Sequence, residues 1–216
     1  ILLRLATLAK RHTLFIKDNE RRVYGKIEID GTKHIYPLRS SMYENWLSAI
    51  FFSTYKKIAS TNLLGNVIQY LEGCSLFEAK IEKVGLRVFG DKDTIEIDIG
   101  NDDWTSVQIS KEGWKIDEHV GHFYRSAGMS ALPIPSNLEN PSEGWLSLIM
   151  GLGDTKEEKL IIAWLLGCFM PNGPFPLLVL QGEQGSGKSS LASLLRSLVD
   201  PNNADKTTLP GSERDL

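Results

Sequence analysis

The apolar positions at the start of the chain follow first a helical and then a strand-like spacing. Leucines recur at helical intervals over residues 1–11, which predicts the end of an amphipathic helix. Residues 13–38 predict a β meander, and Asp30-Gly31 favours a tight hairpin turn within it. The predicted strands are 13–17, 22–29 and 32–36.

Two longer helices are expected next. Ser40 or Ser41 is predicted to cap the first, because Ser41 and Glu44 have the spacing of a capping box. This helix carries Trp46, Leu47, Ile50, Phe51 and Tyr55. Its aromatic and basic residues could contact exposed bases, but core packing plus a solvated end is the favoured interpretation; they are Tyr43, Trp46, Phe51, Tyr55, Lys56 and Lys57. The second helix is predicted at 61–80. Short alternating segments then predict strands at 86–89, 94–99, 106–109 and 114–116.

The last third of the chain combines predicted helices with one apolar strand. Helices are predicted at 143–150 and 155–170, and the prolines of 171–174 end the second. Residues 176–180 are uniformly apolar, which suits a buried parallel strand. Leucines at helical spacing over 188–199 then predict a helix with one apolar face.

A glycine-rich loop lies between this strand and this helix. The run Gly182-Glu183-Gln184-Gly185-Ser186-Gly187-Lys188-Ser189 matches the phosphate-binding pattern G-x-x-x-x-G-K-[ST] at every fixed position. Its glycines are expected to take positive φ and to let backbone N–H groups approach a phosphate, with the helix N-terminus behind them. The predicted nucleotide-binding residues are Gly182, Glu183, Gln184, Gly185, Ser186, Gly187, Lys188, Ser189 and Ser190.

ATP and Mg²⁺ are the cofactors that this pattern predicts. Lys188, the predicted catalytic residue, would reach the β- and γ-phosphates as a point charge, and the Ser189 hydroxyl would ligate Mg²⁺. Glu183 and Gln184 are expected to contribute only their backbone N–H groups. The simpler interpretation is a glycine-rich turn, which does not require Lys-Ser at its end.

Strand, loop and helix in this order predict an α/β P-loop NTPase core preceded by an α+β accessory domain. We place the accessory domain at 1–135, with a possible role in DNA binding or oligomerisation, a linker at 136–142, and the start of the NTPase domain at 143–216. Only 28 residues follow Lys188, so we expect a fragment of a longer protein. The acidic Mg²⁺ site, polar sensor and arginine finger are expected beyond Leu216.

Composition narrows the class of protein. Hydrophobic residues make up 42% of the chain and charged residues 24%, which is ordinary for a globular protein. The longest apolar stretch, 160–170, is too short to span a bilayer, so no membrane partner is expected. Cys74 and Cys168 lack metal-ligand spacing, and buried, reduced thiols would be consistent with a cytoplasmic protein.

The net charge of −3 is unevenly distributed. Residues 1–60 carry eleven Lys and Arg against five acids, a balance of +6, so the remainder carries −9. A basic first quarter hints at a surface that binds a polyanion such as DNA, but ordinary solvated surface is the slightly favoured interpretation.

The amino-acid sequences of several segments resemble those of a known family. The ATPase region of replication proteins from phages, prophages and other mobile elements is similar to Ala163–Ser190, Leu198–Asn202, Leu209-Pro210 and Arg214–Leu216. The region that precedes that ATPase is similar to Tyr36–Ser40 and to Ile97–Trp104 with Gly113-Trp114. These proteins resemble primase-associated helicases related to superfamily three and to AAA+ ATPases.

The resemblance implies a ring-forming homo-oligomer that hydrolyses ATP in response to single-stranded or forked DNA, as a replicative helicase does. The roles of the family's phosphate-loop residues can be assigned only to the matching positions of this chain, which are Gly182, Gly185, Gly187, Lys188 and Ser189. Two other classes use the same loop: a small-molecule or nucleotide kinase, and a non-catalytic module in which nucleotide binding controls an interaction. A GTPase would carry its guanine-reading motif downstream.

Three weaker groups have simpler interpretations. They are His119 with His122 as a metal pair, Asp98, Asp102 and Asp103 as an acidic metal cluster, and Trp104 with Trp114 as rings that stack on bases. The favoured interpretations are surface histidines, a polar turn and packing in a small β core.

Overall fold

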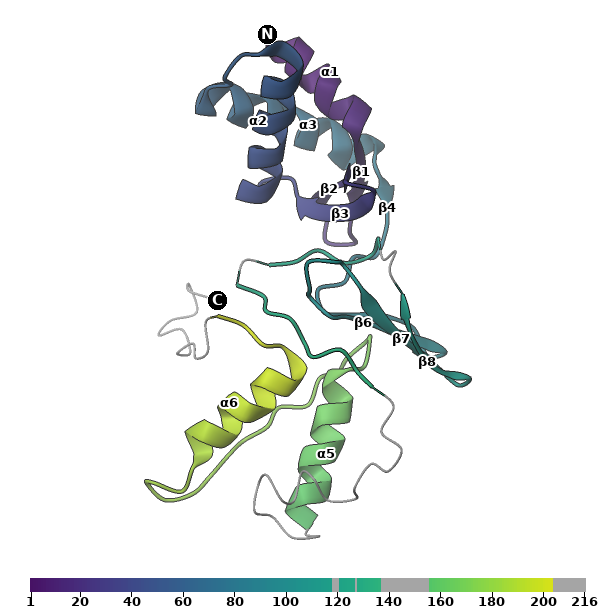
Figure 1. Ribbon diagram of the computed structural model, residues 1–216, viewed down its shortest axis with the longest axis vertical. Coiled ribbons are helices and arrows are strands. Elements are labelled where there is room, and N and C mark those ends of the chain that lie inside the picture. The colour runs from purple at the N-terminus through teal and green to yellow at the C-terminus, as the bar shows by residue number, and fades with distance from the viewer. Residues whose placement is uncertain (118–120, 127, 137–155, 204–216) are drawn as a thin grey trace. The chain divides into compact units, whose positions relative to one another are not determined.

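The computed structural model describes residues 1–117, 121–126, 128–136 and 156–203. The chain forms two compact units, which are described separately below. The first comprises Ile1–Phe89 with Asp117–Arg125, and the second comprises Gly90–Ile116 with Ser126–Leu216 (Figure 1). Apart from Ser136, the linker expected at 136–142 lies outside the described residues, as does the helix expected at 143–150. The predicted domain boundaries therefore stay predictions.

Three helices form the larger layer of the first unit. They are α1 (Leu2–His12), α2 (Ser41–Tyr55) and α3 (Thr61–Glu78). Their apolar faces meet in one core, in which Leu5, Leu47 and Leu71 have no exposed surface. The amphipathic pattern of residues 1–11 is confirmed, because Leu5, Leu8 and Ala9 are buried while Leu3 and Arg4 face outward.

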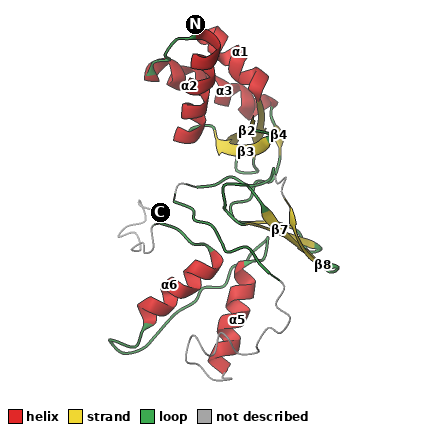
Figure 2. Ribbon diagram, in the orientation of Figure 1, coloured by secondary structure: helices red, strands yellow, loops and turns green. Residues whose placement is uncertain are grey.

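A small sheet forms the other layer, and the helices lie together at one of its faces (Figure 2). Its strands are β1 (Thr13–Lys17), β2 (Val23–Ile29), β3 (Thr32–Pro37) and β4 (Lys80–Ile81), in the order β3-β2-β1-β4. The expected meander is confirmed, with β1–β2 and β2–β3 antiparallel. Asp30 and Gly31 take φ of 51° and 81°, the positive values that a tight hairpin turn requires.

The start of α2 differs from the predicted capping box. Ser40, not Ser41, is the N-cap: its backbone is extended, and its hydroxyl accepts a hydrogen bond from the Tyr43 N–H. Ser41 already belongs to the helix, so its side chain cannot fill the capping position. The spacing to Glu44 favoured Ser41 as the N-cap. The N-cap is the last residue with an extended backbone before the helix, and that residue is Ser40.

The two faces of this sheet have different partners. Val23, Ile27 and Tyr36 point into the core shared with the helices. On the opposite face Ile16, Tyr24 and Ile35 are buried, with Val84 and Tyr124 packed against them. The rings of Tyr24 and Tyr124 lie 5.5 Å apart. The segment around residue 124 thus covers part of the second face.

A second four-stranded sheet has strands in sequential order. They are β5 (Val88–Gly90), β6 (Thr94–Asp98), β7 (Ser106–Ser110) and β8 (Gly113–Asp117). The four strands expected from sequence are confirmed, and β6 and β7 pair antiparallel with Ile97 opposite Val107. Asp98 and Ser106 at the end of that pairing are buried.

Two helices of the second unit carry the candidate site. They are α5 (Lys156–Cys168) and α6 (Lys188–Val199), and the structure confirms the helices predicted at 155–170 and 188–199 within the described residues. All residues between them are loop (Figure 2). Among the helices that the structure describes, none is both long and apolar enough to cross a membrane.

Candidate nucleotide-binding site

The predicted phosphate loop joins an extended segment to the first turn of α6. Gly185 and Gly187 take φ of +86° and +80°, and a Cβ on either would meet open space. Backbone conformation, not crowding, therefore selects glycine at these two positions. A β-branched residue there would be strained in the left-handed region.

Gly182 has a different reason to be glycine than the one expected. Its φ is not in the left-handed region, so the prediction of positive φ at all three glycines is wrong at this position. A Cβ on Gly182 would instead lie 2.7 Å from the Ser186 Oγ. The loop folds back so closely on its first residue that a side chain there would require the Ser186 hydroxyl to move.

Lys188 reaches back over the loop that precedes it. Its Nζ donates hydrogen bonds to the carbonyl oxygens of Gly182 at 2.8 Å and Glu183 at 2.6 Å, and lies 3.2 Å from the Ser186 Oγ. The ammonium group thus lies inside the curve of the loop, on the side where the pattern expects phosphate. These contacts also link the two ends of the loop.

The start of α6 leaves backbone donors for an anion. The first backbone hydrogen bond of α6 runs from the Leu191 N–H to the Gly187 carbonyl, at 2.9 Å. The N–H groups of residues 188–190 therefore precede the helical ladder. Gly187 is the N-cap, and no side chain of the described residues caps this helix. Such an N-terminus attracts a phosphate through its N–H groups and its dipole.

Contacts between α5 and α6 hold the loop from behind. Ile161 of α5 and Leu195 of α6 are buried against each other, with a ring of partly buried apolar residues around them. The Trp164 Nε1 donates a hydrogen bond to the Pro176 carbonyl at 2.9 Å. This bond fixes the extended segment that leads into the loop. Sequence reasoning did not single out Trp164, because an apolar helical face gives no sign of where an indole N–H points.

The apolar segment at 176–180 is extended but is not a strand. Leu177 and Val179 are 95% and 72% exposed, while Leu178 between them packs against the two helices. The prediction of a buried parallel strand is therefore wrong for the structure described here. A strand needs a neighbouring strand for its backbone hydrogen bonds, and the described residues 156–203 contain no strand that could pair with residues 176–180.

The remaining predicted site residues are exposed on the outer surface of the loop. Glu183, Gln184, Ser189 and Ser190 all present their side chains to solvent. Ser189 is the second residue of α6, so its hydroxyl is close in sequence to the Lys188 ammonium and accessible to a metal ion. The structure thus brings the predicted loop residues together around the helix N-terminus.

The weaker candidates do not form a metal site in the part of the chain that the structure describes. No group of three His, Cys, Asp or Glu side chains in that part could hold a metal ion. Asp98 is buried, and its Oδ1 accepts a hydrogen bond from the Gly100 N–H, as in a polar turn. His119 lies outside the described residues, and His122 stacks on the Phe89 ring at 4.6 Å.

The tryptophans and cysteines have ordinary surroundings. Trp104 takes a φ of 53° in a turn, and Trp114 is 40% exposed on β8, so neither is buried in a β core. Cys74 and Cys168 are free and half-buried. Burial raises the pKa of the Cys168 thiol above its usual value, which disfavours the reactive thiolate.

Comparison with known families adds an independent observation about the same part of the chain. Residues 145–216 match the model of a protein family, the actinomycete integrative conjugative element replication protein. This similarity points to a replication protein of a mobile element. The match contains the whole phosphate loop and α6, whereas the segments at 36–40 and 97–104 that resemble replication proteins lie outside it. Comparison with curated proteins finds no match.

The close approach inside the loop gives a testable prediction. Gly182→Ala places a methyl group 2.7 Å from the Ser186 Oγ, so the Ser186 side chain must rotate or the loop must shift. If the loop binds Mg²⁺-ATP as its pattern predicts, the affinity should fall by about tenfold. Titration calorimetry with ATP and Mg²⁺ measures this loss. Adding Ser186→Ala to Gly182→Ala removes the clashing oxygen and should restore part of the affinity, with Ser186→Ala alone as the matched control. An unchanged affinity in Gly182→Ala would show that the loop does not bind nucleotide in this conformation.

Proposed function

We propose that the chain binds Mg²⁺-ATP at residues 182–190 and belongs to a DNA-dependent ATPase that replicates a mobile element. The observation that carries the proposal is the Lys188 ammonium, hydrogen-bonded to two carbonyls of the glycine loop directly before an uncapped helix N-terminus. A positive charge, exposed amides and a helix dipole at one place are what a triphosphate requires.

Each predicted residue then has a role that its position supports. The N–H groups of the loop and of the first turn of α6 would hold the phosphate oxygens, and Lys188 would exchange its contacts with Gly182 and Glu183 for phosphate contacts. The Ser189 hydroxyl would ligate Mg²⁺. Bound ATP and Mg²⁺ supply the phosphoryl group and the charge neutralisation for hydrolysis.

The fold class of this unit belongs to the same proposal. The loop and α6 have the order and contacts of the first part of an α/β P-loop NTPase core, with the extended segment at 176–180 in the place of its first strand. We propose that the complete core assembles when neighbouring strands pair with this segment, whose exposed apolar side chains need cover.

The similarity of residues 145–216 to a mobile-element replication protein supports a role in replication, and ATPase activity is the further step that we propose. Replication requires work on DNA, so the expected activity is ATP hydrolysis stimulated by single-stranded or forked DNA, as in a replicative helicase. A ring-shaped homo-oligomer in the cytoplasm is the assembly that this activity implies.

Hydrolysis of ATP by the protein, measured with and without single-stranded DNA, tests the proposal. We expect slow release of phosphate alone and several-fold faster release with DNA. DNA-independent transfer of the γ-phosphate to a small molecule would instead indicate a kinase. Tight ATP binding with negligible hydrolysis under both conditions would indicate a module that nucleotide binding switches between interactions.

A further inference from the structure

The first unit contains a groove that the phosphate loop does not explain. It has a volume of about 720 Å³ and lies where α1 runs into β1, lined by residues of both faces of the sheet and of α2. Residues 121 and 122 close one end of it. All its lining residues belong to the first unit, so the groove is a property of that unit alone.

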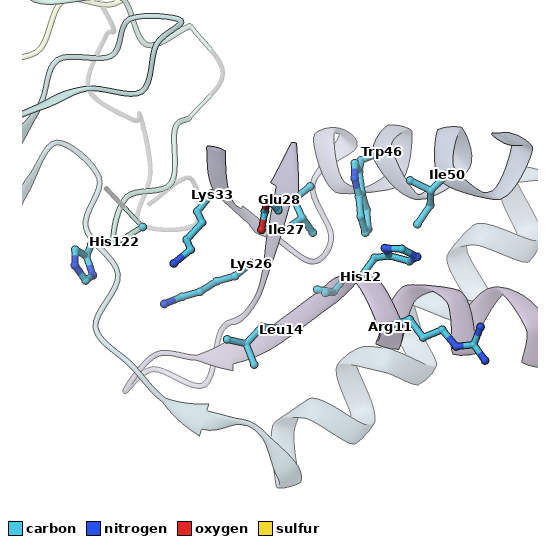
Figure 3. A pocket seen from close by; sticks show the side chains of 12 residues that line it. Arg11, His12, Leu14, Lys26, Ile27, Glu28, Lys33, Trp46, Ile50 and His122 are labelled. Atoms are coloured by element: carbon cyan, nitrogen blue, oxygen red, sulfur yellow. The ribbon is translucent and has the colours of Figure 1, made fainter. Parts of the chain in front are cut away.

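The strand register gathers polar side chains along one side of the groove. Leu14 pairs with Lys26, and Glu28 pairs with Lys33. Paired residues share a face of a sheet, and residues two apart on a strand also share a face, so all four side chains lie on the same face. Figure 3 shows Lys26 and Lys33 extending side by side towards His122.

The lining carries more positive than negative charge. Arg11, Lys26 and Lys33 are its cations, and Glu28 is its one carboxylate among the residues that the structure describes. Lys26 is 19% exposed and forms an ion pair with Glu82 at 2.5 Å, which offsets its charge. Arg11 and Lys33 are exposed and form no ion pair with another described residue, so they are the cations available to an anionic ligand. A ligand with separated negative charges suits this arrangement.

The other end of the groove is aromatic and apolar. Trp46 and Ile50 of α2 project towards His12 (Figure 3). Trp46 is only partly buried, and its ring packs against the buried Tyr43 ring at a centroid distance of 5.3 Å. An indole held in this way offers a preformed surface on which a flat ring can stack. Leu14, 62% exposed, adds apolar surface between the two ends.

A hollow lined by cations, with one indole at its aromatic end, matches a polynucleotide with unpaired bases. A duplex presents only the edges of its bases, inside its grooves, and proteins read them with a protruding helix or strand. Here the surface is hollowed, so an unpaired base can enter it while the phosphates remain near Arg11 and Lys33. The balance of +6 over residues 1–60 adds long-range attraction for such a strand.

We propose that this groove binds single-stranded DNA, with Arg11 and Lys33 contacting phosphates and Trp46 stacking on a base. The proposal deepens the proposed function by naming a DNA-binding surface, but it does not depend on nucleotide binding at Lys188. It also corrects the expectation that the aromatic side chains of α2 serve core packing alone: Tyr43 and Phe51 do so, while Trp46 also lines the groove.

Binding of a fluorescently labelled oligothymidine strand, followed by anisotropy without nucleotide, tests the role of the two cations. Arg11→Ala combined with Lys33→Ala should weaken binding about tenfold or more. The slope of the logarithm of the binding constant against the logarithm of the salt concentration should become about 1.4 less steep, because two phosphate contacts are lost. Lys57→Ala with Lys80→Ala is the matched control, because it removes two exposed cations of the same unit that do not line the groove. We expect it to change affinity less than about twofold.

The aromatic end needs a second measurement, because Trp46→Ala also removes contacts with Tyr43. Trp46→Ala should weaken oligothymidine binding at least about fivefold, and Trp46→Phe should retain most of it. The readout specific to stacking is a comparison with an abasic strand of equal length. Wild-type protein should prefer oligothymidine, and this preference should disappear in Trp46→Ala while circular dichroism shows a folded chain.

Several results would overturn the proposal. Equal losses in the two double variants would mean diffuse attraction rather than a groove, and absence of binding by the wild type would exclude the site. A ribonucleotide strand that binds more than about tenfold tighter would exclude DNA as the ligand. Lys188→Ala should bind oligothymidine normally. Loss of ATP hydrolysis with normal DNA binding in Lys188→Ala would test the nucleotide site alone. Loss of DNA binding with normal DNA-independent hydrolysis in the groove variants would test the groove alone, so either proposal can fail without the other.

Discussion

Lys188→Ala is expected to lower ATP hydrolysis by about two orders of magnitude or more, the scale seen when one preorganised charge-stabilising group is removed. The ammonium lies 2.6 to 2.8 Å from two loop carbonyls, so truncation removes both the positive charge and the link between the ends of the loop. Phosphate release with saturating ATP and single-stranded DNA is the measurement. Affinity for Mg²⁺-ATP, measured by titration, should fall with it.

Lys188→Arg distinguishes the shape of the site from its charge. The narrow curve of the loop fits one compact ammonium, with acceptors from Gly182, Glu183 and Ser186 close around it. A planar guanidinium is wider and carries its donors in a rigid fork, so arginine should not restore activity. Lys156→Ala, which removes an exposed cation at the start of α5, is the matched control and should leave hydrolysis unchanged. Near-normal turnover in Lys188→Ala would refute the assignment of the loop as the ATP site.

The features that sequence predicted well depend on a few neighbouring residues. Asp30-Gly31 specifies a hairpin turn because two adjacent residues take positive φ, and Gly185 and Gly187 are glycine for the same local reason. The leucines of α6 predicted its buried face because helical spacing alone determines which side they share. In each case the prediction depends only on residues that are close together in the sequence.

The failures involve contacts between distant segments. Residues 176–180 have the composition of a buried strand, but only a neighbouring strand can make them one. Gly182 is glycine because Ser186 returns to it, a close approach that the pattern of residue types does not contain. The cap of α2 moved from Ser41 to Ser40 because the end of β3 decides where the extended backbone stops.

The groove of the first unit was the least predictable feature. Its lining comes from α1, three strands, α2 and residues 121 and 122, so no single motif contains it. The signals in the sequence were the excess of Lys and Arg over residues 1–60 and the aromatic and basic residues of the helix that carries Trp46. Ordinary solvated surface and core packing were the favoured interpretations of these signals, and neither gave a location for a groove. Register supplied the location, because it determines that Lys26, Glu28 and Lys33 share a face.

The stability of the first unit should depend strongly on Leu47. This residue of α2 is completely buried in the core that joins the three helices to the sheet. Leu47→Ala removes three carbon atoms from a closely packed environment and leaves a cavity, so the unit should lose about 2 to 5 kcal/mol of unfolding free energy. Hydrogen exchange of peptides from α2 and α3 reports this loss locally, without assuming that the two units unfold together.

Met42→Ala is the matched control for Leu47→Ala, because Met42 lies on the same helix and is 53% exposed. Its replacement should change the unfolding free energy by less than about 0.5 kcal/mol. Equal protection losses in the two variants would mean that α2 does not pack as the structure has it, and the position of Trp46 in the groove would then lose its support. A large loss confined to Leu47→Ala would instead mean that packing holds α2 in place, and with it the surface on which a base is proposed to stack.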